Sequence, residues 1–355
     1  MEWLAIVPIL GLLMIAHELG HFIVAKRSGI VVEEFAIGFP PRLLSRVHDG
    51  VRYSLNLIPF GAYVRMLGEE DPSAPGSFAS QPKRIRALVL VAGSAMNFLV
   101  AVAVFALAYA SGWPELAAGP VHIGGTAPGS PAERSGLRSG DIVRQVDGRP
   151  VATIPEFQGE IQRHLGQPME LLLERGDQTV PLVVTPRSEW PEGQGSLGVQ
   201  LQRRSVPVPH GPLESLSFGA RRTVDVILLT FIAPVMALRG DLAPELVRPI
   251  GIPGMTQVAA QAASAVLDTG WWFPVLMITG AFSAGLAVAN MLPIPALDGG
   301  RLLFVAVEAI RGRRVRPERE ALIHLVGMAV LLSLMVAISF HDLLVPLGAF
   351  DWGLR

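Results

Sequence analysis

The sequence predicts an α-helical polytopic membrane protein with about four transmembrane helices, a membrane-associated β-hairpin or small sheet, and an inserted α+β domain. Of its 355 residues, 50% are hydrophobic and only 17% are charged, and the mean hydropathy is +0.44. This composition is too apolar for an ordinary soluble protein. Long stretches are almost free of charge, whereas residues 115–203 are charged, rich in glycine and patterned as short strands.

Composition also excludes several classes of function. The net charge of -1 offers no basic surface for nucleic acid. The absence of cysteine excludes a disulfide framework and cysteine-ligated zinc. The first 25 residues lack a basic start, so we expect a retained membrane helix rather than a cleaved signal peptide.

A metal-binding pattern lies at the end of the first predicted span, residues 1–26. His17 and His21 are four residues apart and project from one face of a helix, with Glu18 on the adjoining turn. In this H-E-x-x-H spacing the imidazoles bind Zn²⁺ and the glutamate acts on the metal-bound water. Ionisable side chains near membrane depth cost at least ~2.5–3.5 kcal/mol each, so they are rarely without a role. A polar cluster at a helix end is the alternative.

The basic pair Lys26-Arg27 places the N-terminus outside and residues 27–86 in the cytoplasm by the positive-inside rule. Residues 53–57 alternate between apolar and polar side chains, and a Pro-Phe-Gly turn at 59–61 lets residues 62–67 return as the second arm of a hairpin. Such a hairpin either offers an edge to an extended peptide or is a small structural sheet.

The second predicted span, residues 87–113, contains small residues that allow close helix approach. Asn97 within it either bonds to a neighbouring helix or lines the active site. The domain at 115–203 follows, outside the membrane. Its strands are expected at 121–124, 141–146, 169–175 and 179–185, and its helix at 154–164.

Residues 204–268 are predicted to form an extracytoplasmic, interfacial amphipathic region. The apolar run Val226–Leu238 contains Pro234 and is short for a span, so we expect it to lie at the interface or to re-enter the membrane.

The third predicted span, residues 269–300, ends in the sequence NMLPIPALDGG, which begins at Asn290. Its prolines remove backbone donors, and broken backbone at membrane depth survives only where it is buried or lines a wet cavity. Asp298 is then an acid near the metal, and two histidines with one carboxylate leave the fourth zinc position open for water. A helix-capping aspartate is the alternative.

Residues 301–320 carry six arginines and are predicted to form a cytoplasmic loop. Residues 321–341 form the fourth predicted span. His324 and His341 are expected at the membrane interfaces rather than as metal ligands.

Two segments of the inserted domain, APGSPAERSGLRSGDIV at 127–143 and VDGRPV at 146–151, closely resemble the PDZ signature. Residues 195–199 resemble the carboxylate-binding loop of bacterial PDZ domains, placed last as in circularly permuted members. The resemblance implies a domain that binds a peptide C-terminus or a partner protein by adding a strand at a sheet edge.

The order of the motifs resembles the site-2 protease family of intramembrane zinc metalloproteases, in particular the bacterial branch that includes the regulator of sigma-E protease. The resemblance spans residues 1 to about 340. It implies one zinc ion held by His17, His21 and Asp298, with Glu18 as general base and acid. It places Asn290 on the substrate backbone. Further substrate contacts are expected from the broken motif, the second span and the hairpin: Pro293, Pro295, Asn97, Tyr63, Val64 and Arg65.

The same resemblance implies cleavage of transmembrane segments of single-span proteins, such as anti-sigma factors or remnant signal peptides, in a bacterial inner membrane. The N-terminus and the PDZ domain would lie outside, and the active site toward the cytoplasm. The best-known enterobacterial member has two PDZ domains and this chain shows one, so a size filter built from a PDZ pair is not implied.

Two other function classes stay open. A non-proteolytic PDZ-bearing scaffold would hold a structural metal, which normally has four protein ligands. A metal transporter would need a polar path across the bilayer, and the fourth span is apolar apart from His324.

Overall fold

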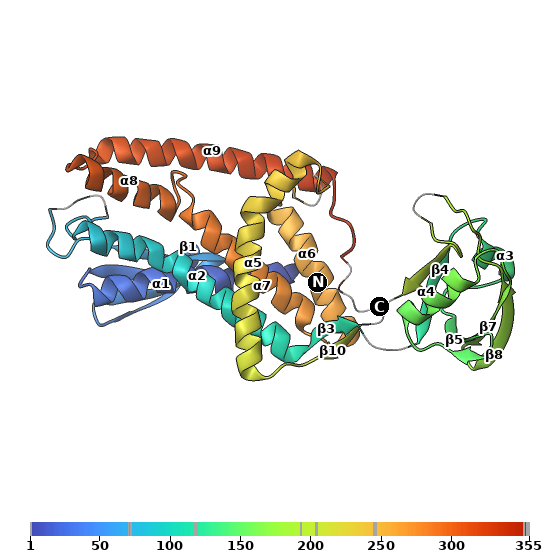
Figure 1. The fold of residues 1–355 in the computed structure, drawn as a ribbon. Coiled ribbons are helices and arrows are strands. Elements are labelled where there is room, and N and C mark those ends of the chain that lie inside the picture. Colours follow the sequence, from blue (N-terminus) through green and yellow to red (C-terminus); the bar gives the residue numbers. More distant parts are fainter. Residues whose placement is uncertain are drawn as a thin grey trace. The chain divides into compact units, whose positions relative to one another are not determined.

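A computed structural model describes residues 2–69, 71, 73–116, 120–191, 194–202, 205–243, 247–350 and 352. The chain forms two compact units, one built from residues up to Ser111 and from Pro209 to Phe350, the other around Gly112–Val208 (Figure 1). The first unit contains a 3-10 turn, seven helices and two long strands among the described residues: η1 (Glu2–Ala5), α1 (Ile6–Arg27), β1 (Val32–His48), β2 (Val51–Met66), α2 (Lys83–Gly112), α5 (Pro212–Arg239), α6 (Ile252–Thr269), α7 (Phe273–Met291), α8 (Asp298–Arg311) and α9 (Pro317–Leu344).

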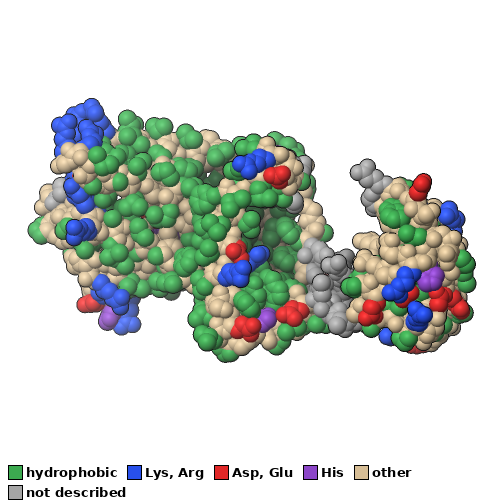
Figure 2. Space-filling view, in the orientation of Figure 1, with side chains coloured by type: hydrophobic (Ala, Val, Ile, Leu, Met, Phe, Trp, Pro, Cys, Tyr) green, Lys and Arg blue, Asp and Glu red, His purple; other side chains and the backbone are tan. Residues whose placement is uncertain are grey.

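Four described helices, α1, α2, α7 and α9, are long and apolar enough to cross a membrane, and they overlap the four predicted spans. The most apolar part of α9 has no residue buried within the protein. Hydrophobic side chains spread over the face of this unit seen in Figure 2, and Lys and Arg side chains gather at the end where α8 meets α9. An apolar outer surface with charge at its ends suits a protein surrounded by lipid.

Helix α7 ends at Met291, before Pro293 and Pro295, whose backbones cannot continue a helix, so the third predicted span ends in broken backbone. Two other predicted segments differ from the structure. The predicted basic loop 301–320 is largely the helix α8, whose apolar side, including Val305, packs into the core. The region 204–268 folds as two defined helices, α5 and α6.

Helix α5 continues through Pro234 as one helix of 28 residues, longer than the apolar run 226–238, and it packs against α2 and α7. A Cβ on its Gly219 would lie 2.6 Å from the Val102 carbonyl oxygen, so α5 lies directly on the α2 backbone. Glycine permits this close approach of two helix backbones.

The membrane-associated sheet is more interleaved than the predicted hairpin. Glu34 of β1 lies opposite Arg65 on one side and opposite Arg52 on the other. The segments 53–57 and 62–67 are therefore not the paired arms of one hairpin, because the first part of β1 lies between them. The second part of β1 instead pairs with the start of β2 across a turn at Asp49 and Gly50, so the segment 62–66 lies at an edge of the sheet.

In the described part of the second unit, a six-stranded sheet and two helices enclose a separate core. The strand order is β8-β7-β5-β4-β9, with β6 paired to β5, and a separate two-stranded ladder joins β3 to β10. Buried side chains from the sheet and from α4, among them Ile123, Phe157 and Leu171, fill the core. The elements are β3 (Trp113–Leu116), β4 (Val121–Thr126), α3 (Pro131–Ser135), β5 (Ile142–Val146), β6 (Arg149–Pro150), α4 (Ile154–Arg163), β7 (Met169–Arg175), β8 (Gln178–Val184), β9 (Val199–Gln202) and β10 (Ser205–Val208).

Candidate metal centre

Close packing of α1 against α2 creates the setting of the candidate centre. A Cβ on Gly20 would lie 2.3 Å from the Ala92 carbonyl oxygen, so the two helices approach to backbone contact. A Cβ on Gly93 would lie 2.4 Å from His21 Nε2 and 2.7 Å from His17 Nε2. The absence of a side chain at Gly93 therefore leaves the space in which both imidazoles lie.

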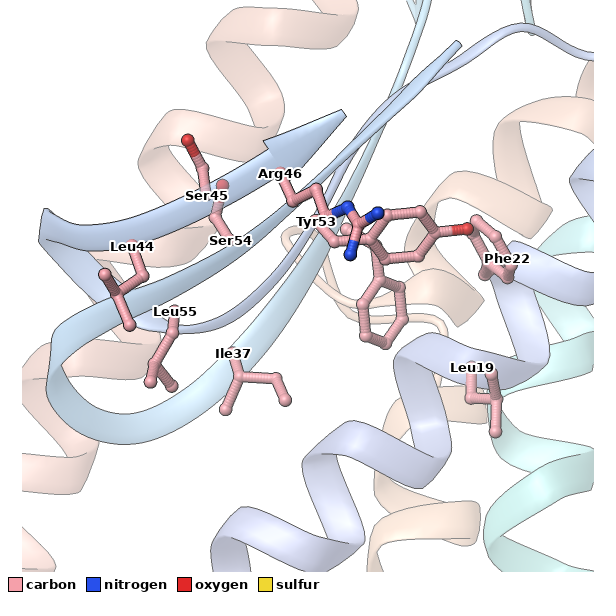
Figure 3. A pocket seen from close by; sticks show the side chains of 10 residues that line it. Leu19, Phe22, Ile37, Leu44, Ser45, Arg46, Tyr53, Ser54 and Leu55 are labelled. Atoms are coloured by element: carbon pink, nitrogen blue, oxygen red, sulfur yellow. The ribbon is translucent and has the colours of Figure 1, made fainter. Parts of the chain in front are cut away.

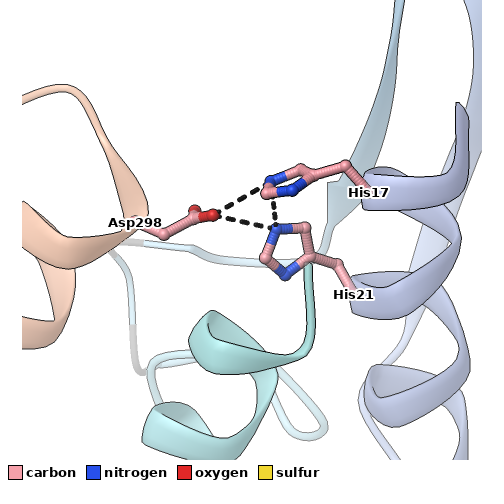
Figure 4. Close-up of side chains that lie close together, drawn as sticks. All are labelled: His17, His21 and Asp298. Carbon is pink, nitrogen blue, oxygen red and sulfur yellow. Dashed lines mark hydrogen bonds and ion pairs between the residues drawn. The ribbon is translucent and has the colours of Figure 1, made fainter. Parts of the chain in front are cut away.

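His17, His21 and Asp298 meet there, as Figure 4 shows. Asp298 Oδ2 is 3.0 Å from His17 Nε2 and 3.2 Å from His21 Nε2, and the two Nε2 atoms are 3.1 Å apart. Zinc–ligand bonds of 2.0–2.1 Å in a tetrahedron place neighbouring ligand atoms about 3.3 Å apart. The three atoms therefore form a triangle of the size that one zinc ion requires.

Hydrogen bonds behind the histidines leave the Nε2 lone pairs available for a metal. His21 Nδ1 donates to the Val89 carbonyl oxygen at 2.7 Å, so its Nε2 carries the lone pair. Asn97 places its side-chain amide 3.3 Å from His17 Nδ1, and its Oδ1 has no hydrogen-bond partner among the described residues. Exchanging the two amide atoms lets Oδ1 accept from His17 Nδ1–H, which is the tautomer that leaves the lone pair on His17 Nε2. The residues present fit a bound zinc ion.

Asp298 is carried by the first turn of α8, which begins where the proline-rich loop ends. A Cβ on Gly299 would lie 2.2 Å from the Leu292 carbonyl oxygen, and one on Gly300 would lie 2.3 Å from the Ile294 carbonyl oxygen. The two glycines therefore let the loop fold back over α8. The Asp298 side chain does not cap this helix, so the capping interpretation is wrong.

A buried ion pair holds α8 against α2. Arg86 Nη2 donates to Glu308 Oε2 at 2.5 Å, and both side chains are about nine-tenths buried. Burial alone would raise the pKa of Glu308, but the hydrogen bond and charge of Arg86, with Arg314 nearby, lower it below its usual value. Glu308 therefore stays ionised and fixes the helix that supplies Asp298.

Glu18 lies beside the sheet edge. Its Oε2 accepts a hydrogen bond from the Val64 backbone N–H at 3.0 Å. This N–H is directed at Glu18 and therefore not at β1, so the edge segment of β2 presents its outer side to the candidate base.

The other residues predicted to contact substrate lie outside the cluster of His17, His21 and Asp298. Tyr63 stacks on Phe39, and the Arg65 guanidinium lies over the Tyr63 ring at 5.9 Å. Asn290 is half-buried in the last turn of α7. Pro293 and Pro295 lie in the loop between α7 and α8.

A separate apolar pocket of about 440 Å³ lies between α1 and the sheet (Figure 3). Leu19 and Phe22 of α1 line one side, and sheet residues, including Ile37, Leu44 and Leu55, line the other. None of the three metal-centre side chains lines it. Its walls suit apolar side chains or acyl chains rather than the chemistry of the cluster.

Sequence reasoning missed two partners of the centre. The Val89 carbonyl that orients His21 belongs to an unremarkable apolar helix turn and has no sequence signal. His324, predicted to be interfacial, accepts a hydrogen bond from the Ala296 N–H in the proline-rich loop. In the sequence, the only indication of this contact is that His324 is a histidine within an otherwise apolar span.

Comparison with known proteins covers nearly the whole chain. The pattern of the family described as Peptidase family M50 matches residues 5–334. A protein of Clostridium perfringens named as a zinc metalloprotease is 33% identical over 94% of this chain and 96% of its own. Zinc metalloprotease RasP of Oceanobacillus iheyensis is 28% identical over 96% of this chain and 98% of its own.

Among solved structures, the PDZ domain of an SdrC-like protein from Listeria monocytogenes aligns with 25% of this chain and 93% of its own, at 20% identity and a TM-score of 0.21. The family match and the metalloprotease relatives extend over both predicted metal motifs. The chain therefore belongs to peptidase family M50, the zinc metalloproteases of the site-2 protease type.

Proposed function

We propose that this integral membrane protein is an intramembrane endopeptidase that cleaves transmembrane segments of single-span membrane proteins. The observation that carries the proposal is the triangle of His17, His21 and Asp298, with Glu18 adjacent to His17. Both histidines are supplied by α1, one of the helices able to cross a membrane. A hydrolytic centre on such a helix acts on substrates that lie in the bilayer.

The proposed roles follow from the donor set. His17, His21 and Asp298 would hold one zinc ion, which would supply a Lewis acid for the scissile carbonyl and would lower the pKa of a water bound to it to ~7. Glu18 accepts the proton of the attacking water and later delivers it to the leaving amine. Asn97 orients His17 from behind, so we assign it to the centre rather than to direct contact with the substrate.

Substrate binding is proposed to use main-chain pairing. A transmembrane helix hides its own peptide bonds, so the target segment must unwind before it can be cut. The edge segment of β2, with Tyr63, Val64 and Arg65, would pair with the extended chain beside Glu18. Asn290 and the loop with Pro293 and Pro295 would hold its other side.

The rival classes are less well supported. A scaffold with a structural zinc would normally supply a fourth protein ligand, and within the described ranges His17, His21 and Asp298 are the only such cluster of three or more. A transporter needs polar groups along its path, whereas α9 is apolar over most of its length. The three-ligand centre favours hydrolysis.

The unit around Gly112–Val208 is proposed to be a PDZ domain that binds a peptide C-terminus or a partner protein outside the cytoplasm. Among its described residues, the antiparallel sheet with the helices α3 and α4 supports this assignment. We place the protein in a bacterial inner membrane, and the basic pair in the last turn of α1 supports an orientation with the N-terminus outside and the active site toward the cytoplasm.

The decisive experiment is co-expression of the protein with candidate single-span substrates, such as anti-sigma factors and remnant signal peptides. We expect Glu18→Gln to abolish cleavage while zinc content and membrane insertion stay at the wild-type level. Glu33→Gln, at an exposed position on β1, is the matched control and should cleave normally. Mapping the cut should place it within the transmembrane segment; full cleavage by Glu18→Gln, or a cut only outside the membrane, would refute the proposal.

A further inference from the structure

Helix α9 contacts the loop that precedes Asp298 through one specific hydrogen bond. The Ala296 backbone N–H donates to His324 Nδ1 at 2.8 Å. Ala296 has a φ of 78°, in the left-handed region that residues other than glycine rarely adopt. An external partner for its N–H helps to keep this unfavourable turn in place.

A second contact lies on the same face of α9. Gly327 follows His324 by three residues, so the two project from one side of the helix. A Cβ on Gly327 would lie 2.3 Å from Pro295 Cβ, so only glycine allows α9 to approach the loop this closely. One helix face therefore holds two consecutive loop residues, Pro295 by packing and Ala296 by hydrogen bonding.

At this end of α9 the His324 ring also packs against Phe304 of α8, with ring centroids 5.3 Å apart. The most apolar part of α9 has no buried residue. At the opposite end of α9, Asp342 accepts hydrogen bonds from the Gly251 N–H at 2.7 Å and the Gly254 N–H at 3.0 Å, which fixes α9 to the start of α6. Helix α9 is thus attached near both ends, and one attachment is the loop beside the metal centre.

The loop is connected to Asp298 by hydrogen bonds of the residues on either side of it. The Leu297 N–H donates to the Ile294 carbonyl oxygen at 3.2 Å, and the Gly300 N–H donates to the Leu297 carbonyl oxygen at 3.0 Å. Gly300 also lies directly against Ile294. A shift of Ala296 would therefore move the first turn of α8, and with it the carboxylate that faces His17.

We propose that His324 is a positioning residue for the metal centre: its Nδ1 holds the Ala296 turn, and this turn sets the position of Asp298. The inference rests on the proposed function, in which Asp298 is a zinc ligand. It requires the imidazole to carry its proton on Nε2 so that Nδ1 can accept. His324 does not touch the substrate or the metal in this arrangement.

Two substitutions at one position test the hydrogen bond itself. His324→Asn places an amide oxygen where Nδ1 lies and keeps the acceptor, whereas His324→Leu removes it and keeps an apolar side chain of similar size. His341→Leu, at the other end of α9, is the matched control. The readouts are the rate of zinc loss during dialysis of the purified full-length protein against a chelator, and kcat and KM for a cleaved single-span substrate.

We expect His324→Leu to lose zinc about 10–100-fold faster and to lower kcat with little change in KM, because loss of the groups that orient metal ligands has effects of this size. His324→Asn should restore both values to near wild type, and His341→Leu should change neither. Gly327→Ala, which pushes on Pro295, should reproduce the zinc loss. Equal zinc loss in the Asn and Leu variants, or none in the Leu variant, would overturn the role of the hydrogen bond.

Asp298→Ala separates this inference from the proposed function. If Asp298→Ala retains zinc and cleaves, the ligand assignment fails and the proposed function fails with it. If Asp298→Ala loses zinc but His324→Leu does not, only the positioning role of His324 is wrong. Gel filtration in detergent and thermal unfolding of each variant identify any loss that comes from misfolding.

Discussion

Glu18 and Val64 are 46 residues apart in sequence, yet the Val64 backbone N–H donates to Glu18 Oε2 at 3.0 Å. The proposed base on α1 and the edge of the β-sheet are therefore parts of one site. A peptide added at this edge would lie beside the carboxylate that accepts the proton. The bond also orients Glu18 before substrate arrives.

Removal of this N–H should reduce catalysis without loss of the metal. Val64→Pro deletes the donor on the outer side of an edge strand, where proline is tolerated. We expect kcat to fall by about 10²-fold, because a catalytic group displaced by ~1 Å costs that much. Zinc content, measured by atomic absorption, should stay at the wild-type level. Val64→Ala keeps the N–H and should retain most of the activity; equal losses in both variants would argue against the role of the N–H.

The space beside Gly93 predicts an unusually strict requirement for glycine. A Cβ at this position would lie 2.4 Å from His21 Nε2, so Gly93→Ala should displace an imidazole and abolish zinc binding and cleavage. Gly285→Ala, on α7, meets no atom within 4 Å and should leave both properties intact. Zinc titration of the two purified variants measures the difference. Normal zinc affinity in Gly93→Ala would contradict the assigned packing of α1 against α2.

Substitution of Asn97 should lower the zinc affinity of the centre, and not only the stability of the fold. Asn97→Leu removes the partner of His17 Nδ1, and loss of such a partner typically lowers metal affinity 10–100-fold. Ser94→Ala is a suitable control in the same helix, because the buried Ser94 hydroxyl has no hydrogen-bond partner among the described residues. Competition with a fluorescent zinc chelator gives both affinities. A change of equal size in the two variants would show that helix packing, not orientation of His17, is responsible.

The second unit should lose stability in acid through Asp141. Burial alone would raise the pKa of this carboxyl, but hydrogen bonds from Arg175, both 2.7 Å long, and from the Arg138 N–H lower it below 3.8. A carboxyl whose pKa is lowered in the folded state stabilises the fold above its unfolded pKa, and this stabilisation disappears as pH falls through the folded pKa. The unit should therefore be most stable near neutral pH and weaken below pH ~4.

Asp141→Asn tests this dependence. At pH 7 it should destabilise the unit by about 3 kcal/mol, because it removes the negative charge that the Arg175 guanidinium pairs with. The difference in unfolding free energy between the variant and the wild type should narrow below pH ~4, where the carboxyl of the unfolded chain gains its proton first and the folded carboxyl follows at lower pH. Urea unfolding of the full-length protein, followed by tryptophan fluorescence, measures both curves. Asp177→Asn, at an exposed position, should follow the wild type at every pH.

Local spacing made part of the site predictable. His17 and His21 had to share a helix face at four residues apart, and the prolines before Asp298 had to end α7. The sheet order could not be predicted, because the strand that separates 53–57 from 62–67 comes from residues earlier in the chain. The contact between His324 and Ala296 depends on how α9 packs, and no sequence pattern encodes it.

The pairing of β3 with β10 has a consequence for how the chain accommodates its insertion. Trp113 lies opposite Val208, so β3, which follows α2, and β10, which precedes α5, are paired as antiparallel strands. This pairing keeps the first and last residues of the inserted segment at a fixed separation, whatever the size of the segment between them. Modules of different size or number could be exchanged at this point without disturbing the helices that carry the chemistry.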